Sequence, residues 1–219
     1  RNSELRPGDC VRVAPHGWEE KVWIPPQFQP NDVSLTLLRQ RAFNLAREAS
    51  QEKSQEGLIP FIPFLGGISA DFPQDNAHSH KIAMVIRQDV HRPAWPNGSF
   101  ELPSLLGLGR GLTPSGDDFT AGFLLAAVRL FRAEEKPGFA EGIESLLLAA
   151  RAKTTHLSAT MLHGAARGWA DERLIAMTDS LAAASPDFAA VAIGLRTYGS
   201  TSGLDALAGC LAATRVFTK

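Results

Sequence analysis

The sequence predicts an α+β protein, with a small β-containing N-terminal part and a mainly helical C-terminal half that carries glycine-rich loops at helix N-termini. Residues 9–24 are typical of two short strands joined by a turn at 15–17. From residue 101 onward Ala, Leu and Gly dominate, and runs of β-branched residues vanish. We therefore divide the chain into residues 1–100 and 101–219, and expect the two parts to form one compact domain.

One long helix is expected in the N-terminal part. Residues 25–30, PPQFQP, form a stiff connector, because each proline fixes its own φ and restricts the residue before it. Asn31 or Asp32 can then cap a helix that runs to about Gln51. The apolar positions that recur at helical spacing are Leu37, Leu38, Leu45 and Ala49.

The segments between this helix and residue 101 leave alternatives open. Residues 57–67 are apolar but interrupted by two prolines, which favours either a buried loop or a wall that faces a substrate. Residues 69–80 are typical of an exposed loop, and residues 91–99 of another loop. Residues 81–90 are too few for periodicity to decide between a helix and a strand.

Six helices are predicted in the C-terminal half. They span roughly 117–133, 139–151, 157–170, 171–184, 186–197 and 203–216. The first of them is apolar on nearly every side, which indicates a central, buried helix.

The pattern SGxDxxAGxLxA occurs twice, each time where a helix of small residues begins. Ser115, Gly116, Asp118, Ala121, Gly122, Leu124 and Ala126 fall on Ser202, Gly203, Asp205, Ala208, Gly209, Leu211 and Ala213. We expect the two helix starts to lie close together and to face one pocket. A simpler interpretation is capping, in which each Ser accepts a backbone N–H and each Asp lies in the first turn, where the helix dipole favours it.

The first copy holds more than a cap requires. It adds Gly107, Gly109 and Gly111, the pair Thr113-Pro114, and a second acid at Asp117. A glycine-rich loop that leads into a buried helix exposes backbone N–H groups to one concave spot, which suits a phosphate or a carboxylate. Neither GxGxxG nor the P-loop pattern is present, so the loop indicates anion binding more than nucleotide binding.

The candidate substrate-binding residues come from three motifs. The third motif, at 153–168, begins with Thr154 or Thr155 as a helix cap and would add hydroxyl groups to the same pocket. The full set is Gly109, Arg110, Gly111, Thr113, Ser115, Gly116, Lys153, Thr155, Ser158, Ser202 and Gly203.

Three aspartates, Asp117, Asp118 and Asp205, are the candidate catalytic residues. Their oxygens could hold Mg²⁺. We favour a role without metal or other cofactor, in which one aspartate caps a helix and another accepts an N–H from an amide substrate or acts as a base. Since Asp118 has the cap-like spacing from Ser115, we expect Asp118 to serve folding and Asp117 to serve function.

Composition narrows the class of partner. A net charge of −1 without a basic block argues against nucleic acid or an anionic membrane as the main partner. No stretch has the length of a membrane span and no signal peptide is visible, although the chain begins with Arg1, as a trimmed piece of a longer protein would. Cys10 and Cys210 are too few for a disulfide framework, so a reduced, cytoplasmic setting is expected.

Three segments, GLGRGLTPSGDDFTAG, KTTHLSATML and GSTSGLDALAG, together resemble one bacterial domain family over about residues 100–216. That family includes the AllH-type subunit of oxamate carbamoyltransferase, an enzyme of anaerobic allantoin breakdown; Arg110 stands where the family more often has Pro. The resemblance implies a protein that works with other subunits of a transferase complex on small amide-bearing anions such as oxamate and carbamoyl phosphate. Two alternatives stay open: an interaction subunit whose glycine-rich turns only cap and pack helices, and a phosphate- or nucleotide-binding enzyme of other specificity.

Overall fold

The structure is a computed structural model, and it describes residues 33–51, 54–73, 80–89 and 101–218. Within these ranges the chain is helical and has no β-strand, so the α+β assignment is wrong. The two strands predicted at 9–24 lie outside the described residues. The elements are α1 (Leu35–Ala49), η1 (Ile59–Phe61), α2 (Ile62–Leu65), α3 (His80–Asp89), α4 (Leu102–Leu105), α5 (Ser115–Phe131), η2 (Ala133–Glu135), α6 (Phe139–Lys153), α7 (His156–Ala165), α8 (Glu172–Ser180), α9 (Phe188–Arg196) and α10 (Ser202–Phe217).

Two segments that the sequence left undecided are helical. In α3, the buried side chains of Ile82, Ala83 and Ile86 share one face at helical spacing, which anchors this segment against the core as a helix. Residues 57–67 form the short helices η1 and α2, with a proline in the first turn of each, where its missing N–H costs no hydrogen bond. Most of the apolar side chains in this segment are buried, so it belongs to the core.

The six helices predicted after residue 101 are all present, as α5 to α10. Two of them, α7 and α8, end at Ala165 and Ser180, several residues earlier than predicted. The long N-terminal helix is also present as α1, but its cap is Ser34, whose hydroxyl accepts a hydrogen bond from the Leu37 N–H at 3.2 Å.

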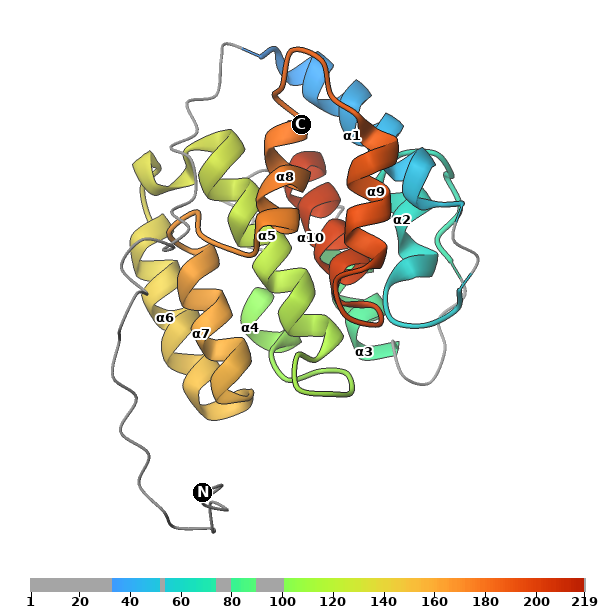
Figure 1. The fold of residues 1–219 in the computed structure, drawn as a ribbon. Helices are drawn as coiled ribbons and strands as arrows, with labels where there is room; N and C mark the ends of the chain where they lie inside the picture. The colour runs from blue at the N-terminus through green and yellow to red at the C-terminus, as the bar shows by residue number, and fades with distance from the viewer. Residues whose placement is uncertain (1–32, 52–53, 74–79, 90–100, 219) are drawn as a thin grey trace, which may run out of the picture.

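The helices α5 and α10 form the centre of the fold, with α7 and α8 packed on α5 and α1, α2 and α9 packed on α10 (Figure 1). The repeated glycines allow α5 and α10 to approach each other closely. A Cβ atom at Gly122 would overlap the Ala206 carbonyl oxygen, and one at Gly209 would overlap the Phe119 carbonyl oxygen. Since Ala206 and Phe119 are themselves equivalent in the repeat, the two helices cross with an approximate twofold relation.

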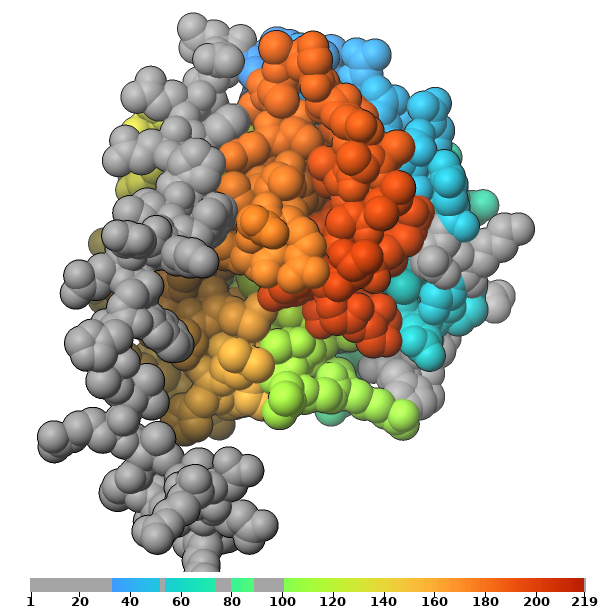
Figure 2. Space-filling model, in the orientation of Figure 1, coloured from blue at the N-terminus to red at the C-terminus, as the bar shows by residue number. Residues whose placement is uncertain are grey.

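The loop that precedes α5 projects from one end of the molecule (Figure 2). Within it, the Leu112 side chain is 73% exposed. In the described ranges, none of the helices combines the length and the apolar character that a bilayer crossing requires.

Candidate functional site

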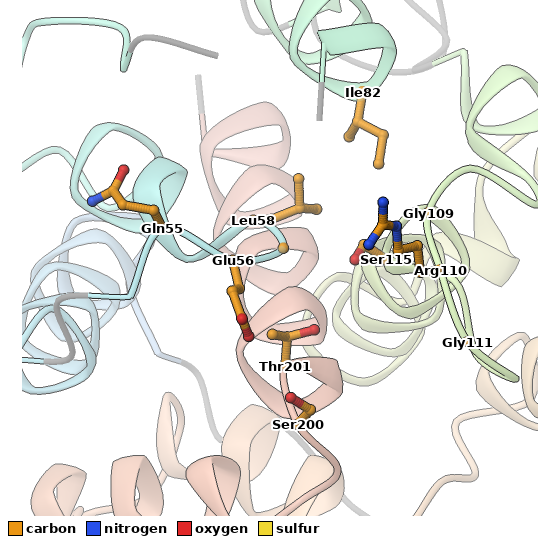
Figure 3. Close-up of a pocket in the computed structure, with 11 residues that line it drawn as sticks. Gln55, Glu56, Leu58, Ile82, Gly109, Arg110, Gly111, Ser115, Ser200 and Thr201 are labelled. Atoms are coloured by element: carbon orange, nitrogen blue, oxygen red, sulfur yellow. The ribbon is translucent and has the colours of Figure 1, made fainter. Parts of the chain in front are cut away.

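A cavity of about 730 Å³ opens at the end of the molecule where α5 and α10 begin. Its walls come from the turn at 55–58, from α3, from the glycine-rich loop at 109–111, from the start of α5 and from the residues before α10 (Figure 3). The lining residues are Gln55, Glu56, Gly57, Leu58, Ile82, Gly109, Arg110, Gly111, Ser115, Ser200 and Thr201.

The expectation that the two repeated helix starts lie together is confirmed. The Oγ1 atom of Thr113, two residues before α5, and the Oγ atom of Ser202, the first residue of α10, are 3.1 Å apart. We call these two groups the Thr113–Ser202 hydroxyl pair. Ser115 lines the cavity from α5, whereas its counterpart Ser202 does not, and Thr201 takes that place.

The capping interpretation of the repeat is wrong for the two serines, although Asp118 and Asp205 lie in the first turns as it expected. Ser115 and Ser202 are the first helical residues rather than the caps, which are Pro114 and Thr201, and neither cap side chain accepts a backbone N–H of the helix start. Each serine instead hydrogen-bonds to the aspartate of the opposite helix, Ser115 to Asp205 and Ser202 to Asp118. The repeat is therefore a reciprocal contact between two helices.

Asp205 accepts hydrogen bonds from three residues that line the cavity on different sides, Leu58, Thr201 and Ser115. Its Oδ1 accepts the Leu58 N–H at 2.6 Å, and its Oδ2 accepts the Thr201 hydroxyl at 2.8 Å. Gly57, with φ of +53°, brings the turn so close that any Cβ would overlap Asp205. Burial raises the pKa of Asp205 to about 6, although these hydrogen bonds and that from Ser115 favour the charged form.

Asp118 is the counterpart of Asp205, but it is less well paired. Its side chain is 2% exposed, and its Oδ2 is buried without a hydrogen-bond partner. Burial raises the pKa of Asp118 to about 8; hydrogen bonds from Ser202 and Thr113 oppose this, and the nearby charges of Asp205 and Asp117 add to it. At pH 7 this carboxyl is therefore mainly neutral.

Asp117 fastens the glycine-rich loop to the third motif. Its Oδ1 accepts the Gly107 N–H at 2.8 Å, and its Oδ2 accepts the Thr154 hydroxyl. These two hydrogen bonds favour a folding role for Asp117, whereas its spacing led us to expect a functional one. No local pattern predicts the contact with Thr154, which lies 37 residues away along the chain.

We expect Asp117→Ala to lower the free energy of unfolding by about 2 kcal/mol, since it leaves the Gly107 N–H and the Thr154 hydroxyl without their acceptor. Asp117→Asn should cost less than half as much, because its amide oxygen can still accept the Gly107 N–H. Urea denaturation of the two variants measures the difference. Equal stability of Asp117→Ala and the wild type would show that the loop does not depend on these two hydrogen bonds.

The other residues of the third motif support the same loop. The Thr155 hydroxyl donates to the Leu112 carbonyl oxygen at 2.7 Å and also caps α7, as predicted for Thr154 or Thr155, by accepting the Ser158 N–H. The Ser158 hydroxyl reaches the same Leu112 oxygen at 3.4 Å. The Lys153 ammonium donates to the Pro103 carbonyl oxygen at 3.0 Å. Thr155 and Ser158 thus hold the loop, Lys153 bonds to α4, and none of the three lines the cavity.

Backbone N–H groups at the start of α5 already have acceptors. The Gly116 N–H donates to the Leu108 carbonyl oxygen at 2.8 Å, and those of Asp117 and Asp118 donate to Pro114 at 2.8 and 3.1 Å. Gly116 and Gly203 serve packing, because a Cβ atom would overlap the carbonyl oxygens of Leu105 and Leu195 respectively. The structure therefore does not present these N–H groups to an anion as the sequence suggested.

Among the described residues that line the cavity, Arg110 is the cation. It is exposed, and its guanidinium lies beside Ser115 and faces Leu58 and Ile82 across the opening (Figure 3). The flanking Gly109 and Gly111 have positive φ values of +125° and +89°, which glycine adopts readily and which turn the loop so that Arg110 faces inward. Gly109, Arg110, Gly111 and Ser115 are the predicted binding residues that line the cavity.

Seven of the lining residues were not predicted as site residues, including Glu56, Leu58, Ile82 and Thr201. Thr201 could have been found, because it directly precedes the second copy of the repeat. Gly57 and Leu58 belong to the segment 57–67, for which the sequence offered a wall that faces a substrate as one of two alternatives. Nothing in the sequence pointed to Glu56. In the described part of the chain no three His, Cys, Asp or Glu residues gather as a metal site would require, and Mg²⁺ binding by the aspartates gains no support from their hydrogen bonds to the protein.

The fold and site define a helical protein with a ligand-sized cavity at the crossing of two buried helices. Residues 105–214, about half of the chain and the region of all three motifs, match the family described as oxamate carbamoyltransferase subunit AllH, and the chain belongs to this family. Neither the curated proteins nor the solved structures provide a significant match to the chain.

Proposed function

We propose that the protein is a subunit of a carbamoyltransferase-type enzyme, and that its cavity binds a small amide-bearing anion of the oxamate or carbamoyl phosphate class. The observation that carries this proposal is the inward-facing Arg110, set on the glycine-rich loop inside the region that the family matches. The family's description as a subunit supports the presence of other subunits of the transferase complex. The cytoplasmic setting expected from the cysteine content is part of the same proposal.

The chemistry of the cavity suits such a ligand. A guanidinium binds a carboxylate or a phosphate with two parallel hydrogen bonds and keeps its charge at any physiological pH. Ser115, beside Arg110, and Ser200 and Thr201, across the cavity, bring hydroxyl groups, and Glu56 brings a further acceptor. The hydroxyls of Ser115 and Thr201 already donate to Asp205, so toward a ligand their oxygens accept an N–H. A cavity of about 730 Å³ holds a small anion together with water, or with a second small substrate.

We expect Arg110→Gln to weaken oxamate binding at least tenfold, because it removes the positive charge that the cavity offers to the carboxylate. The stability of the fold should change by less than about 0.5 kcal/mol, since the side chain is exposed. Isothermal titration calorimetry measures the affinity, first on the chain alone and then on the complex that it forms with co-purified partner subunits.

Arg132→Gln is the matched control, because Arg132 is an exposed arginine at the opposite end of α5 and its substitution should leave oxamate binding unchanged. If the wild type binds oxamate and Arg110→Gln binds it equally well, the anion does not lie in this cavity.

The interaction-subunit alternative is favoured by one observation of its own. Leu112 projects from the glycine-rich loop with 73% of its side chain exposed, while the hydroxyls of Thr155 and Ser158 hold the carbonyl of that same residue. An exposed apolar side chain on a loop whose backbone is held by two hydrogen bonds also suits a contact with another protein. That alternative predicts that Leu112→Asp releases the partner subunits while the chain, with or without them, fails to bind oxamate, oxalate, carbamoyl phosphate or phosphate.

A further inference from the structure

Asp205 controls the direction in which two hydroxyl groups of the cavity point. The Thr201 hydroxyl donates its proton to the Asp205 Oδ2 at 2.8 Å, and the Ser115 hydroxyl donates to the same carboxylate. A hydroxyl group has one proton and two lone pairs, so each of these oxygens can only accept from any further partner. Since Ser115 and Thr201 both line the cavity, a ligand there meets two hydroxyl oxygens that act as acceptors.

The surroundings of Asp205 keep the two hydroxyl protons in this direction. Its side chain is fully buried, its Oδ1 accepts the Leu58 N–H at 2.6 Å, and the turn at Gly57 packs directly against it. A buried carboxylate that loses a hydrogen-bond donor pays the full cost of its lost hydration, because water does not replace the donor. The protons of Ser115 and Thr201 therefore stay on Asp205 and point away from the cavity.

The remaining polar groups of the cavity show where a ligand would place its charge. The Arg110 guanidinium lies beside Ser115 on one wall, and Thr201 lies across the opening from it (Figure 3). Glu56, which also lines the cavity, adds a carboxylate acceptor. An anionic group that binds Arg110 thus has acceptors on both sides of it, and the ligand gains most when the atoms next to that group carry N–H protons.

We propose that Asp205 is a positioning residue that makes the cavity selective for a primary amide, by turning the oxygens of Ser115 and Thr201 into acceptors for the amide N–H groups. This inference rests on the proposed function and assigns the parts of its ligand: the carboxylate or phosphate binds Arg110, and the NH₂ group binds the two hydroxyl oxygens. Asp205 acts through these hydroxyls and does not itself touch the ligand.

The repeat supplies a matched residue outside the cavity. Asp118 is the equivalent of Asp205, and it accepts hydrogen bonds from the Thr113–Ser202 hydroxyl pair. Asp118, Thr113 and Ser202 are not among the residues that line the cavity. Substitution of Asp118 therefore removes an equivalent carboxyl group without changing the hydroxyls that face the ligand.

The test compares oxamate with pyruvate, which has the same charge and nearly the same shape but carries a methyl group where oxamate has its NH₂. Isothermal titration calorimetry at pH 8, where Asp205 with its pKa of about 6 is ionised, measures both affinities on the chain and on its complex with partner subunits. The wild type should bind oxamate at least about tenfold more tightly than pyruvate, because each N–H donated to a hydroxyl oxygen contributes about fivefold.

Asp205→Asn should reduce this preference to about twofold or less, while both anions still bind through Arg110. The new amide oxygen can accept the Leu58 N–H, but the new NH₂ group would donate to the Thr201 oxygen and turn the Thr201 proton toward the ligand. Thr201→Val keeps Asp205 and removes one acceptor, so it should lower the oxamate affinity about fivefold more than the pyruvate affinity. Asp118→Asn is the control and should keep the wild-type preference.

The outcomes separate this inference from the proposed function. A wild type that binds oxamate and pyruvate equally would overturn the inference and leave the anion site at Arg110 standing. The same conclusion would follow if Asp205→Asn and Thr201→Val kept the full preference, or if Asp118→Asn lost as much of it as they do. If Asp205→Asn does not fold, Thr201→Val decides. If neither anion binds in any form of the protein, the proposed function itself fails, and this inference with it.

Discussion

Replacing Gly209 with alanine is expected to lower the free energy of unfolding by about 3 kcal/mol, at the upper end of the usual cost of overpacking a core. The new Cβ would overlap the carbonyl oxygen of Phe119 and come within 2.8 Å of the Phe123 nitrogen, and both obstacles are backbone atoms of α5. Backbone inside a buried helix cannot rotate away as a side chain can. Gly122→Ala should cost a similar amount, because its Cβ would meet the equivalent backbone of Ala206.

Gly194→Ala is the matched control for this prediction. Gly194 lies inside α9, and the nearest atom to an added Cβ is the Arg173 Cγ at 3.8 Å, an ordinary van der Waals distance. With no obstacle, the better helix propensity of alanine should stabilise the protein by roughly 0.5–1 kcal/mol. Urea denaturation of the three variants measures the difference, and similar stabilities of Gly209→Ala and Gly194→Ala would mean that α5 and α10 do not approach as closely as described.

Most of the helical half could be predicted from the sequence because its signals are local and repeated. Apolar residues at helical spacing predicted α5 to α10, and the repeated glycines marked the two helices that cross. The class was wrong because weight was given to strands at 9–24, which lie outside the described residues. The short segment at 81–90 was left undecided because it has too few turns to show a period. Only burial of Ile82 and Ile86 against the core identifies α3 as a helix.

The site was harder to predict, since its hydrogen bonds join distant parts of the chain. The three-residue spacing of Ser115 and Asp118 suggested one local cap, yet Ser115 pairs with Asp205 and Asp118 pairs with Ser202. The hydrogen bond from the Leu58 N–H to Asp205 joins residues 147 positions apart, and no local sequence pattern predicts it. The position of the motif at the two helix starts was therefore predicted correctly, but its hydrogen-bond partners were not, because they come from distant parts of the chain.

The pH dependence of stability should show which of the two equivalent aspartates is unpaired. The ordinary pKa of an aspartate is 3.8, and burial raises that of Asp118 to about 8 and that of Asp205 to about 6. Between the unfolded and the folded pKa, the folded state holds a proton that the unfolded chain has already released. Stability is therefore greatest near pH 4 and falls as pH rises, over the window up to about pH 6 for Asp205 and up to about pH 8 for Asp118.

From pH 6 to 8 the wild type should lose up to about 1.4 kcal/mol of stability per pH unit through Asp118 alone, which is the linkage value for one proton. Asp118→Asn should remove this loss, because its amide does not titrate. Asp205→Asn is the matched control: it should reduce the decline between pH 4 and 6 by about half, since Asp118 still contributes there, and leave the decline from pH 6 to 8 in place. Urea denaturation across the pH range measures all three curves. A wild-type stability that rises from pH 6 to 8, or an unchanged decline in Asp118→Asn, would show that Asp118 is ionised in the free protein and already has a partner for Oδ2.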